Sequence, residues 1–322
     1  KHKSSDNSWA AQPLSFCALP PHRLPDVWPD EETMSTDQSP RPDEEARREF
    51  WTFHMDRSAD LLQAMQQQPT EESGEGFTSI PDAATAAGVE MWFSESKIAG
   101  DLERIFFIRE SLIADLMAIG RDMNERGWIL KIEDGYRTRE MQTQLGRKPA
   151  VFDMIVRSCQ WESGGQKPTL DLIKRRSTCL VANYPNAGTH TMGAAVDISV
   201  FNRTDGTEVS RGKPYLEMSE LTPMDSPFVS AQEQKNRADI TAMMEAHGFL
   251  HYPGEFWHYN KGDSLYRLVT KSGLPAPFGP VHWDPQTNTA TAYEDVSSPL
   301  TPPDLLATLL DEAMARIGSD NT

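Results

Sequence analysis

The sequence predicts an α+β fold in which a small antiparallel sheet is flanked by helices. Two short strands carry this prediction: Ala194–Val200 is a mostly apolar run with Asp197 at its middle, typical of a buried strand, and Phe256–Tyr259 is rich in aromatic residues. Helical periodicity marks segments before and between these strands. The 322 residues are enough for one large or two ordinary domains. We expect an N-terminal arm and helical extension (1–95), a central domain (96–265), and a C-terminal extension ending in a helix (266–322).

The N-terminal region divides into an arm, a helix and a loop. Residues 1–45 are rich in Pro, Ser, Asp and Glu, which is typical of a loosely ordered arm. A helix is expected from Pro42 to about Gln68, where apolar residues recur at helical intervals. The polar run 66–76 is then expected to form a loop. Three aromatic residues of the arm are candidate anchors onto the body: Trp9, Phe16 and Trp28.

A long helix from Ile98 to Arg126 is expected to lead into the first strand of the central domain. An apolar stripe runs through it, and Gly127 supplies the stop. The following segment, Ile129–Arg137, is predicted to be a strand. This order places Arg137 at a strand terminus, where catalytic residues are often positioned.

The later segments give two further helices and one long insertion. Ser230 with Glu233 three residues on forms a capping box that starts a helix running to Gly248. A C-terminal helix follows Pro302 and should pack its apolar face on the body. The segment between Gly146 and Gly188 is either a surface excursion or a wall that shapes access to a site.

Charge and hydropathy exclude several functions. The net charge is −17, from 31 basic and 48 acidic residues, and no Lys/Arg run stands out, so neither nucleic acid nor an anionic membrane surface is an expected partner. No apolar run approaches the roughly 20 residues of a membrane span, and no signal-peptide pattern is present. Because the chain starts at Lys1, we expect that an upstream segment has been removed or left out, and location stays open.

The three cysteines do not form a metal-like pattern. Cys17, Cys159 and Cys179 are odd in number and widely spaced. We interpret them as structural thiols, with a disulfide between the last two as the alternative. The oligomeric state cannot be read from the sequence.

Two short segments carry the inventory of a catalytic zinc site. Gly188-Thr-His-Thr-Met-Gly-Ala-Ala-Val-Asp197 and Gly254-Glu-Phe-Trp-His258 supply two imidazoles and two carboxylates. A catalytic zinc takes three protein ligands and keeps a fourth position for water. We therefore predict one Zn²⁺ per chain, bound by His190, Asp197 and His258, with Glu255 as the general base.

The spacing within the first segment requires a break in the chain. Seven residues is an odd offset, so one continuous strand would send His190 and Asp197 to opposite faces. Gly193 offers the break. Three other histidines, His247, His251 and His282, are expected to be structural or exposed rather than ligands.

These residues resemble the bacterial zinc peptidases that cut D-alanyl-D-alanine, the D-Ala-D-Ala dipeptidases and D,D-carboxypeptidases. The family pattern is Ser-x-His-x-x-Gly-x-Ala-x-Asp followed later by Glu-x-Trp-His, and only Gly188 departs from it. The resemblance implies a sonic hedgehog-like fold, the ligands and base named above, and a peptide substrate containing D-amino acids. It also favours a bacterial cell envelope or secreted location. It covers about residues 96–263.

Two further segments bear on the substrate. The end of the segment Ile129–Arg137 is similar to the family's strand ending in Gly-Tyr-Arg, which makes Arg137 the candidate oxyanion stabiliser. In the dipeptidases an aspartate holds the free amine where this chain has Leu216, and Glu217 should point the other way. A D,D- or L,D-carboxypeptidase or an endopeptidase on longer stems therefore stays an alternative to a dipeptidase.

Two other classes of protein are alternatives to an enzyme. The hedgehog signalling domain shows that this scaffold can serve as a non-catalytic zinc-containing binding module. The presence of Glu255 favours an enzyme. A purely structural zinc is disfavoured because such sites normally have four protein ligands, usually rich in cysteine.

Overall fold

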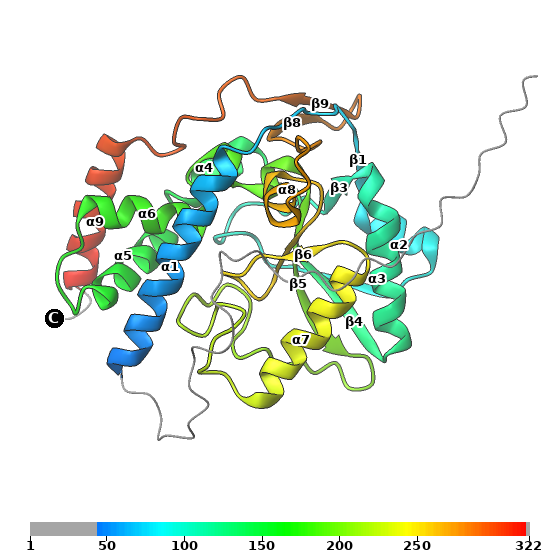
Figure 1. Ribbon diagram of the computed structural model, residues 1–322, viewed down its shortest axis with the longest axis horizontal. Coiled ribbons are helices and arrows are strands. Elements are labelled where there is room, and N and C mark those ends of the chain that lie inside the picture. Colours follow the sequence, from blue (N-terminus) through cyan, green and yellow to red (C-terminus); the bar gives the residue numbers. More distant parts are fainter. Residues whose placement is uncertain (1–43, 320–322) are drawn as a thin grey trace, which may run out of the picture. The chain divides into compact units, whose positions relative to one another are not determined.

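The computed structural model describes residues 44–319, which form one compact unit. Its centre is a five-stranded sheet in the order β2-β4-β5-β7-β6. Figure 1 shows helices on both sides of this sheet. The α+β class is thus confirmed. The predicted region boundaries at residues 95 and 265 stay predictions.

The central sheet is antiparallel except at one edge. It contains β4 (Trp128–Asp134), β5 (Ala195–Asn202), β7 (His258–Asn260) and β6 (Leu250–His251), each antiparallel to its neighbour. The edge strand β2 (Met91–Phe93), which was not predicted, runs parallel to β4. The middle strand β5 is buried from Ala195 to Val200 because both of its faces are covered.

Two helices pack on the sheet and against each other. Helix α3 (Ile113–Glu125) packs on β4, and α7 (Ala231–Ala246) packs on β6 and on α3. The predicted capping box is present at the start of α7, where Ser230 and Glu233 each accept a hydrogen bond from the other's backbone. A shorter helix, α2 (Ile80–Ala87), packs beside α3.

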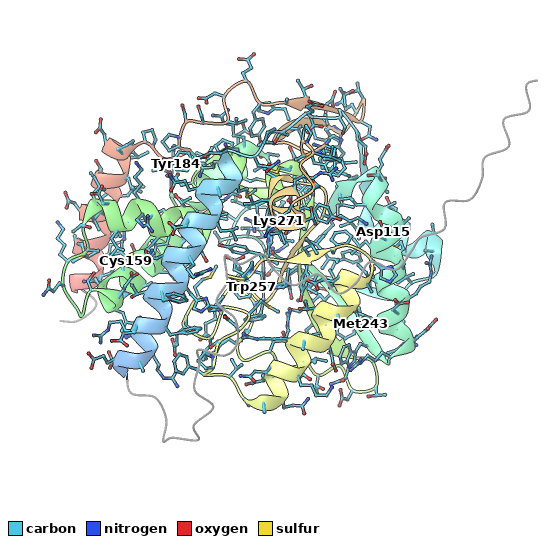
Figure 2. All side chains as sticks on the ribbon, viewed as in Figure 1. Asp115, Cys159, Tyr184, Met243, Trp257 and Lys271 are labelled. Carbon is cyan, nitrogen blue, oxygen red and sulfur yellow. The ribbon has the colours of Figure 1, made fainter. Side chains whose placement is uncertain are left out.

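Four other helices share a separate core. These are α1 (Glu44–Gln66), α5 (Pro149–Glu162), α6 (Leu170–Val181) and α9 (Pro303–Ser319), and Figure 1 shows them gathered on one side of the molecule. Cys159 on α5, labelled in Figure 2, is fully buried among them. The predicted helix at 42–68 and the packing of the C-terminal helix on the body are confirmed for the described residues. The segment 146–188 is mostly helical.

Two small ribbons and two short helices complete the unit. β1 (Phe77–Ser79) pairs with β3 (Phe107–Arg109), and β8 (Val281–Asp284) pairs with β9 (Thr289–Ala292). Phe77, Tyr136, Val281 and Ala290 form the core between them. Helices α4 (Arg139–Leu145) and α8 (Ser264–Thr270) follow β4 and β7.

The predicted helix Ile98–Arg126 is wrong over its first half. Ala99 and Gly100 have φ of 48° and 89°, outside the helical region, and residues 107–109 form β3 instead. Regular α-helix begins only at Ile113, after one 3₁₀ turn. Before that point the chain pairs with other segments, as in the bridge between Ile105 and Tyr136, and Ile105 is only partly buried.

Two strand boundaries also differ from the prediction. β4 ends at Asp134, three residues before Arg137, and β7 begins only at His258. Phe256 and Trp257 lie in the preceding turn and are buried there. Tertiary packing therefore overrides their preference for strand.

The predictions for the cysteines, the N-terminal arm and a membrane span can be compared with the structure only where it describes the chain. Cys159 and Cys179 are free and buried, so the alternative of a disulfide between them is wrong. The arm, with Trp9, Phe16 and Trp28, lies outside the described residues, as does Cys17. Within residues 44–319, no helix has both the length and the apolar character that a membrane crossing requires.

Candidate active site

The structure brings His190, Asp197 and His258 together at the centre of the sheet. All three side chains are buried, and one ligand atom from each lies within 4.8 Å of the others. Asp197 Oδ1 is 3.2 Å from His190 Nε2 and 2.9 Å from His258 Nδ1. This cluster could hold a metal ion, as the sequence predicted.

The sheet register places two of these residues side by side. Asp197 on β5 is the direct cross-strand partner of His258 on β7 and of Asp134 on β4. A register shift between Ile132 and Asp134 makes the pairing with β4 possible, as bulges beside active sites commonly do. Residues opposite each other in antiparallel strands point to the same face, so the three side chains form one row.

The break that brings in His190 lies where the spacing predicted it. His190 is on a 3₁₀ helix, Thr189–Met192, which ends at Gly193 with φ of 67°. A Cβ at this glycine would lie 2.0 Å from the Phe77 ring, so no other residue fits without displacing that ring. The tight turn then lets β5 begin at Ala195 and present Asp197 to the imidazole.

Hydrogen bonds orient both imidazoles, and the sequence did not identify these partners. His190 Nδ1 lies 2.7 Å from the Gly135 carbonyl and donates to it, which leaves Nε2 free to face Asp197. His258 Nε2 lies 2.8 Å from Thr189 Oγ1, and its Nδ1 faces Asp197. Such partners fix the tautomer and direction of metal-binding histidines.

Replacing Thr189 with valine should weaken metal binding by about 10- to 100-fold, because His258 loses the partner that orients it. Zinc affinity measured by competition with a chelating dye tests this. The matched control is Thr241→Val, which removes a buried hydroxyl bonded to Tyr259 away from the cluster. Equal affinity of both variants and the unmodified chain would show that Thr189 does not orient the ligand.

Asp197 sits between positive and hydrogen-bonding groups. Burial alone would raise the pKa of its carboxyl group, but the adjacent His190 and His258 hold it well below its ordinary value. Its second oxygen, Oδ2, accepts a hydrogen bond of 2.9 Å from Tyr215 and lies 3.5 Å from Arg137 Nη2. Tyr215 was missed by sequence reasoning, although it directly precedes Leu216.

Arg137 lies in the same cavity and is held by a carboxylate. Its Nε donates to Asp134 Oδ2 at 2.7 Å, and its Nη2 is also 2.7 Å from that oxygen. Nη1 donates to Gln142 Oε1 at 3.3 Å. Although burial opposes it, the charges of Asp134 and Asp197 raise the pKa of Arg137, so the guanidinium stays protonated.

Glu255 lines the cavity on a turn just before β7. A hydrogen bond of 3.2 Å from its backbone N–H to the Tyr252 carbonyl shapes this turn. Burial, followed by the negative charge of Asp197, raises the pKa of Glu255 to about 8. A carboxylate with a raised pKa in a cavity is suited to proton transfer near neutral pH.

The raised pKa of Glu255 predicts how the stability of the metal-free protein depends on pH. The folded state favours the neutral carboxyl, so stability is lost as pH rises from about 4.5 towards 8. Glu255→Gln removes this loss and should stabilise the metal-free protein on the order of 2 kcal/mol at pH 8, with little effect at pH 4.5. The Glu255 side chain is partly exposed to solvent, so the gain in stability should be smaller than the whole pKa shift would give.

Urea unfolding of both proteins in the presence of a chelator, at several pH values, measures this difference. Glu245→Gln serves as control, because Glu245 bonds to His251 at the surface of α7. A difference between the Glu255 variant and the unmodified chain that does not change with pH would contradict the assigned pKa.

One cavity of about 290 Å³ connects all five predicted site residues. Glu255 and Arg137 line it together with the two histidines and Asp197. Trp257, labelled in Figure 2 and almost fully buried, also contributes to its lining. The segment 146–188 contributes residues of α5 and α6, so this insertion is part of the wall of the site and is more than a surface excursion.

His247, His251 and His282 lie away from the cluster, as predicted. His247 contacts Asp122 at 2.7 Å, and His251 contacts Glu245 at the same distance. His282 packs its ring on Tyr293. None of the three belongs to the His-Asp-His cluster found among residues 44–319.

Comparison with known proteins gives one consistent result. The model of the peptidase M15 family, described as D-ala-D-ala dipeptidase, matches residues 96–272, more than half of the chain. A D-alanyl-D-alanine dipeptidase of Streptomyces coelicolor is 33% identical over 168 residues, which are 52% of this chain and 79% of the relative. One of Enterococcus faecium is 28% identical over 145 residues, 44% of this chain and 66% of the relative.

The chain spans just under two thirds of the two Enterococcus relatives, 66% and 65% of their lengths. Among solved structures, a vancomycin-resistance D,D-pentapeptidase, VanY, in complex with Zn(II) aligns at 16% identity over 55% of this chain and 86% of that chain, with a TM-score of 0.30.

Proposed function

We propose that this chain, which belongs to the D-ala-D-ala dipeptidase family of peptidases, is a zinc-dependent peptidase that hydrolyses the bond between two D-alanine residues. The observation that carries the proposal is the shared cavity, in which the His-Asp-His cluster, Glu255 and Arg137 face one another. Peptides of peptidoglycan metabolism are the proposed substrates. We also propose a bacterial cell envelope or secreted location, which the resemblance to this family favours.

The three clustered residues fit zinc. Ligands about 2.0–2.2 Å from a tetrahedral zinc lie roughly 3.3 Å from one another, close to the 3.2 and 2.9 Å found between Asp197 and the two imidazoles. Burial lowers the pKa of His258, which favours the neutral imidazole that binds metals. Three ligands leave one position open, as in catalytic sites. Zinc held there would supply Lewis acidity toward a water molecule and a carbonyl oxygen.

The remaining residues divide the proton and charge handling between them. Glu255 accepts a proton from the attacking water and returns it to the leaving amine. Arg137 donates hydrogen bonds to the oxygen that becomes negative in the tetrahedral intermediate. Asp134 holds the Arg137 guanidinium in place by accepting its hydrogen bond. Tyr215 holds Asp197 in place by donating a hydrogen bond to Asp197 Oδ2. The presence of an acid poised beside the cluster favours an enzyme over a binding module.

The cavity offers little to a free amino group. Among its lining residues within the described chain, the only carboxylates are Asp197 and Glu255. Leu216 also lines it, where the dipeptidases place an aspartate, and Glu217 is paired with Lys213 outside the lining. An ammonium group buried without a carboxylate is unfavourable. We therefore propose that N-blocked or longer D-Ala-D-Ala peptides are cleaved in addition to the free dipeptide.

Leu216→Asp should shift preference toward the free dipeptide, because it adds a carboxylate at the cavity wall. We expect the ratio of kcat/KM for free D-Ala-D-Ala to that for N-acetyl-D-Ala-D-Ala to rise about 10-fold or more. Leu216→Asn, which adds a polar group without charge, is the matched control. If the unmodified chain cleaves only the free dipeptide, another acid holds the amine and the assignment of Leu216 is wrong.

Product analysis tests the proposed function itself. The zinc-loaded protein is incubated with free D-Ala-D-Ala, N-acetyl-D-Ala-D-Ala and a pentapeptide stem ending in D-Ala-D-Ala, and the products are identified by mass. Release of D-alanine supports a peptidase, and the set of cleaved substrates separates dipeptidase from carboxypeptidase. Intact substrates with fully zinc-loaded protein would reject the proposal.

A further inference from the structure

The active-site cavity has an apolar wall that the hydrolysis step does not require. This wall is formed by α5 and α6, which contribute Val151, Met154, Leu180 and Val181 to the lining. Leu180 and Val181 are buried in the helical core, and Val151 and Met154 pack against it. Because these side chains belong to or pack against the helical core, they have little freedom to move into the cavity.

Leu216, from a segment outside α5 and α6, adds a further apolar side chain to the same cavity lining. Its side chain is 45% exposed although it is large and apolar, and it lines the cavity. Its φ is 69°, in the left-handed region that a leucine adopts only with strain. Strained backbone at the edge of a catalytic cavity is typical of a residue held in place for binding.

Few residues of the cavity lining carry charge or could bind a metal. Its charged or metal-binding lining residues are Arg137, Glu255 and the three members of the cluster. The side chains named above carry no charge, and neither do their neighbours in the lining, Leu145 and Ala150. A methyl group would leave much of this apolar surface exposed to water, whereas a larger apolar side chain would cover it.

We propose that this wall, formed by Val151, Met154, Leu180, Val181 and Leu216, is a subsite for a large apolar side chain next to the scissile bond. The enzyme would accordingly prefer a peptide with a leucine-sized D-residue on one side of that bond over one with D-alanine on both sides. This inference rests on the proposed peptidase function and specifies its substrate class.

Three blocked peptides test the subsite: N-acetyl-D-Ala-D-Ala, N-acetyl-D-Leu-D-Ala and N-acetyl-D-Ala-D-Leu, each with the zinc-loaded protein. At least one leucine peptide should exceed the alanine peptide about 10-fold or more in kcat/KM, the range expected when extra methylenes enter an apolar pocket. Cleavage of the alanine peptide with no gain from either leucine peptide overturns the subsite and leaves the proposed function intact. Failure to cleave all three overturns both.

Substitutions in the wall test whether these residues cause the preference for leucine peptides. Met154→Gln keeps the side-chain length and adds polarity, and Leu216→Asn uses a residue that tolerates a left-handed φ. Each should reduce the ratio of leucine to alanine cleavage about 3-fold or more. Leu274→Asn is the control, since Leu274 is equally apolar, 57% exposed and outside the cavity lining. An unchanged ratio in both wall variants would place the preference elsewhere and overturn the assignment.

Discussion

Replacing Glu255 with glutamine should lower kcat for peptide hydrolysis by about 10²- to 10⁴-fold while leaving bound zinc in place. Glutamine has nearly the same shape and removes only the ability to accept and return a proton. The affinity for zinc should change little, because Glu255 is not among the three clustered ligands. Steady-state kinetics with metal content measured on the same sample checks both parts.

Glu245→Gln is the control for this experiment, because it alters an acid of the same type on the surface of α7. Its turnover should match that of the unmodified chain. A Glu255 variant with undiminished turnover would show that another group accepts the proton.

Replacing His258 with alanine should remove both zinc and activity. The loss leaves two ligands, His190 and Asp197, and a partly vacated buried site. Catalytic zinc is normally held by three protein ligands, so we expect less than about one tenth of the metal to remain after dialysis. Metal analysis and D-alanine release measured on the dialysed protein provide the test.

The chain contains a matched control in His251, seven residues earlier on β6. His251 bonds to Glu245 and lies outside the cluster, so His251→Ala should keep its zinc and its activity. Full metal content in the His258 variant, or equal losses in the two variants, would contradict the assigned ligand set.

The clustering of His190, Asp197 and His258 could be predicted from the sequence because two local constraints bring these residues together. The odd spacing between His190 and Asp197 requires a turn, and Gly193 provides it with a positive φ and no room for a side chain. In the second segment Glu255 and His258 lie only three residues apart, on the turn that leads into β7 and at the first residue of that strand. Such short-range constraints can be recognised in the sequence without knowledge of the tertiary structure.

The groups that orient the ligands could not be predicted in the same way. His190 donates to a backbone carbonyl, that of Gly135, and every residue has such a group, so the sequence contains no signal for it. Tyr215 reaches Asp197 from a segment 18 residues away, and only the folded chain brings them together. Thr189 was adjacent to a predicted ligand, but its partner is the other imidazole.

The failure of the predicted helix at Ile98 has a similar origin. The apolar spacing of this segment fits a helix. The positive φ of Ala99 and Gly100 nevertheless interrupts a helix there, and β3 pairs with β1 instead. The two helices of segment 146–188 were not predicted at all. They pack on α1 and α9, which are distant in sequence, and form the apolar wall of the cavity.

The central claim is that one zinc ion held by His190, Asp197 and His258 makes this chain a peptidase. Titrating the metal-free protein with Zn²⁺ while following D-alanine release from N-acetyl-D-Ala-D-Ala tests it most directly. Activity should rise in proportion to added zinc and level off at about one equivalent per chain. Activity that is already complete without metal, or that never appears at saturating zinc, would contradict the claim.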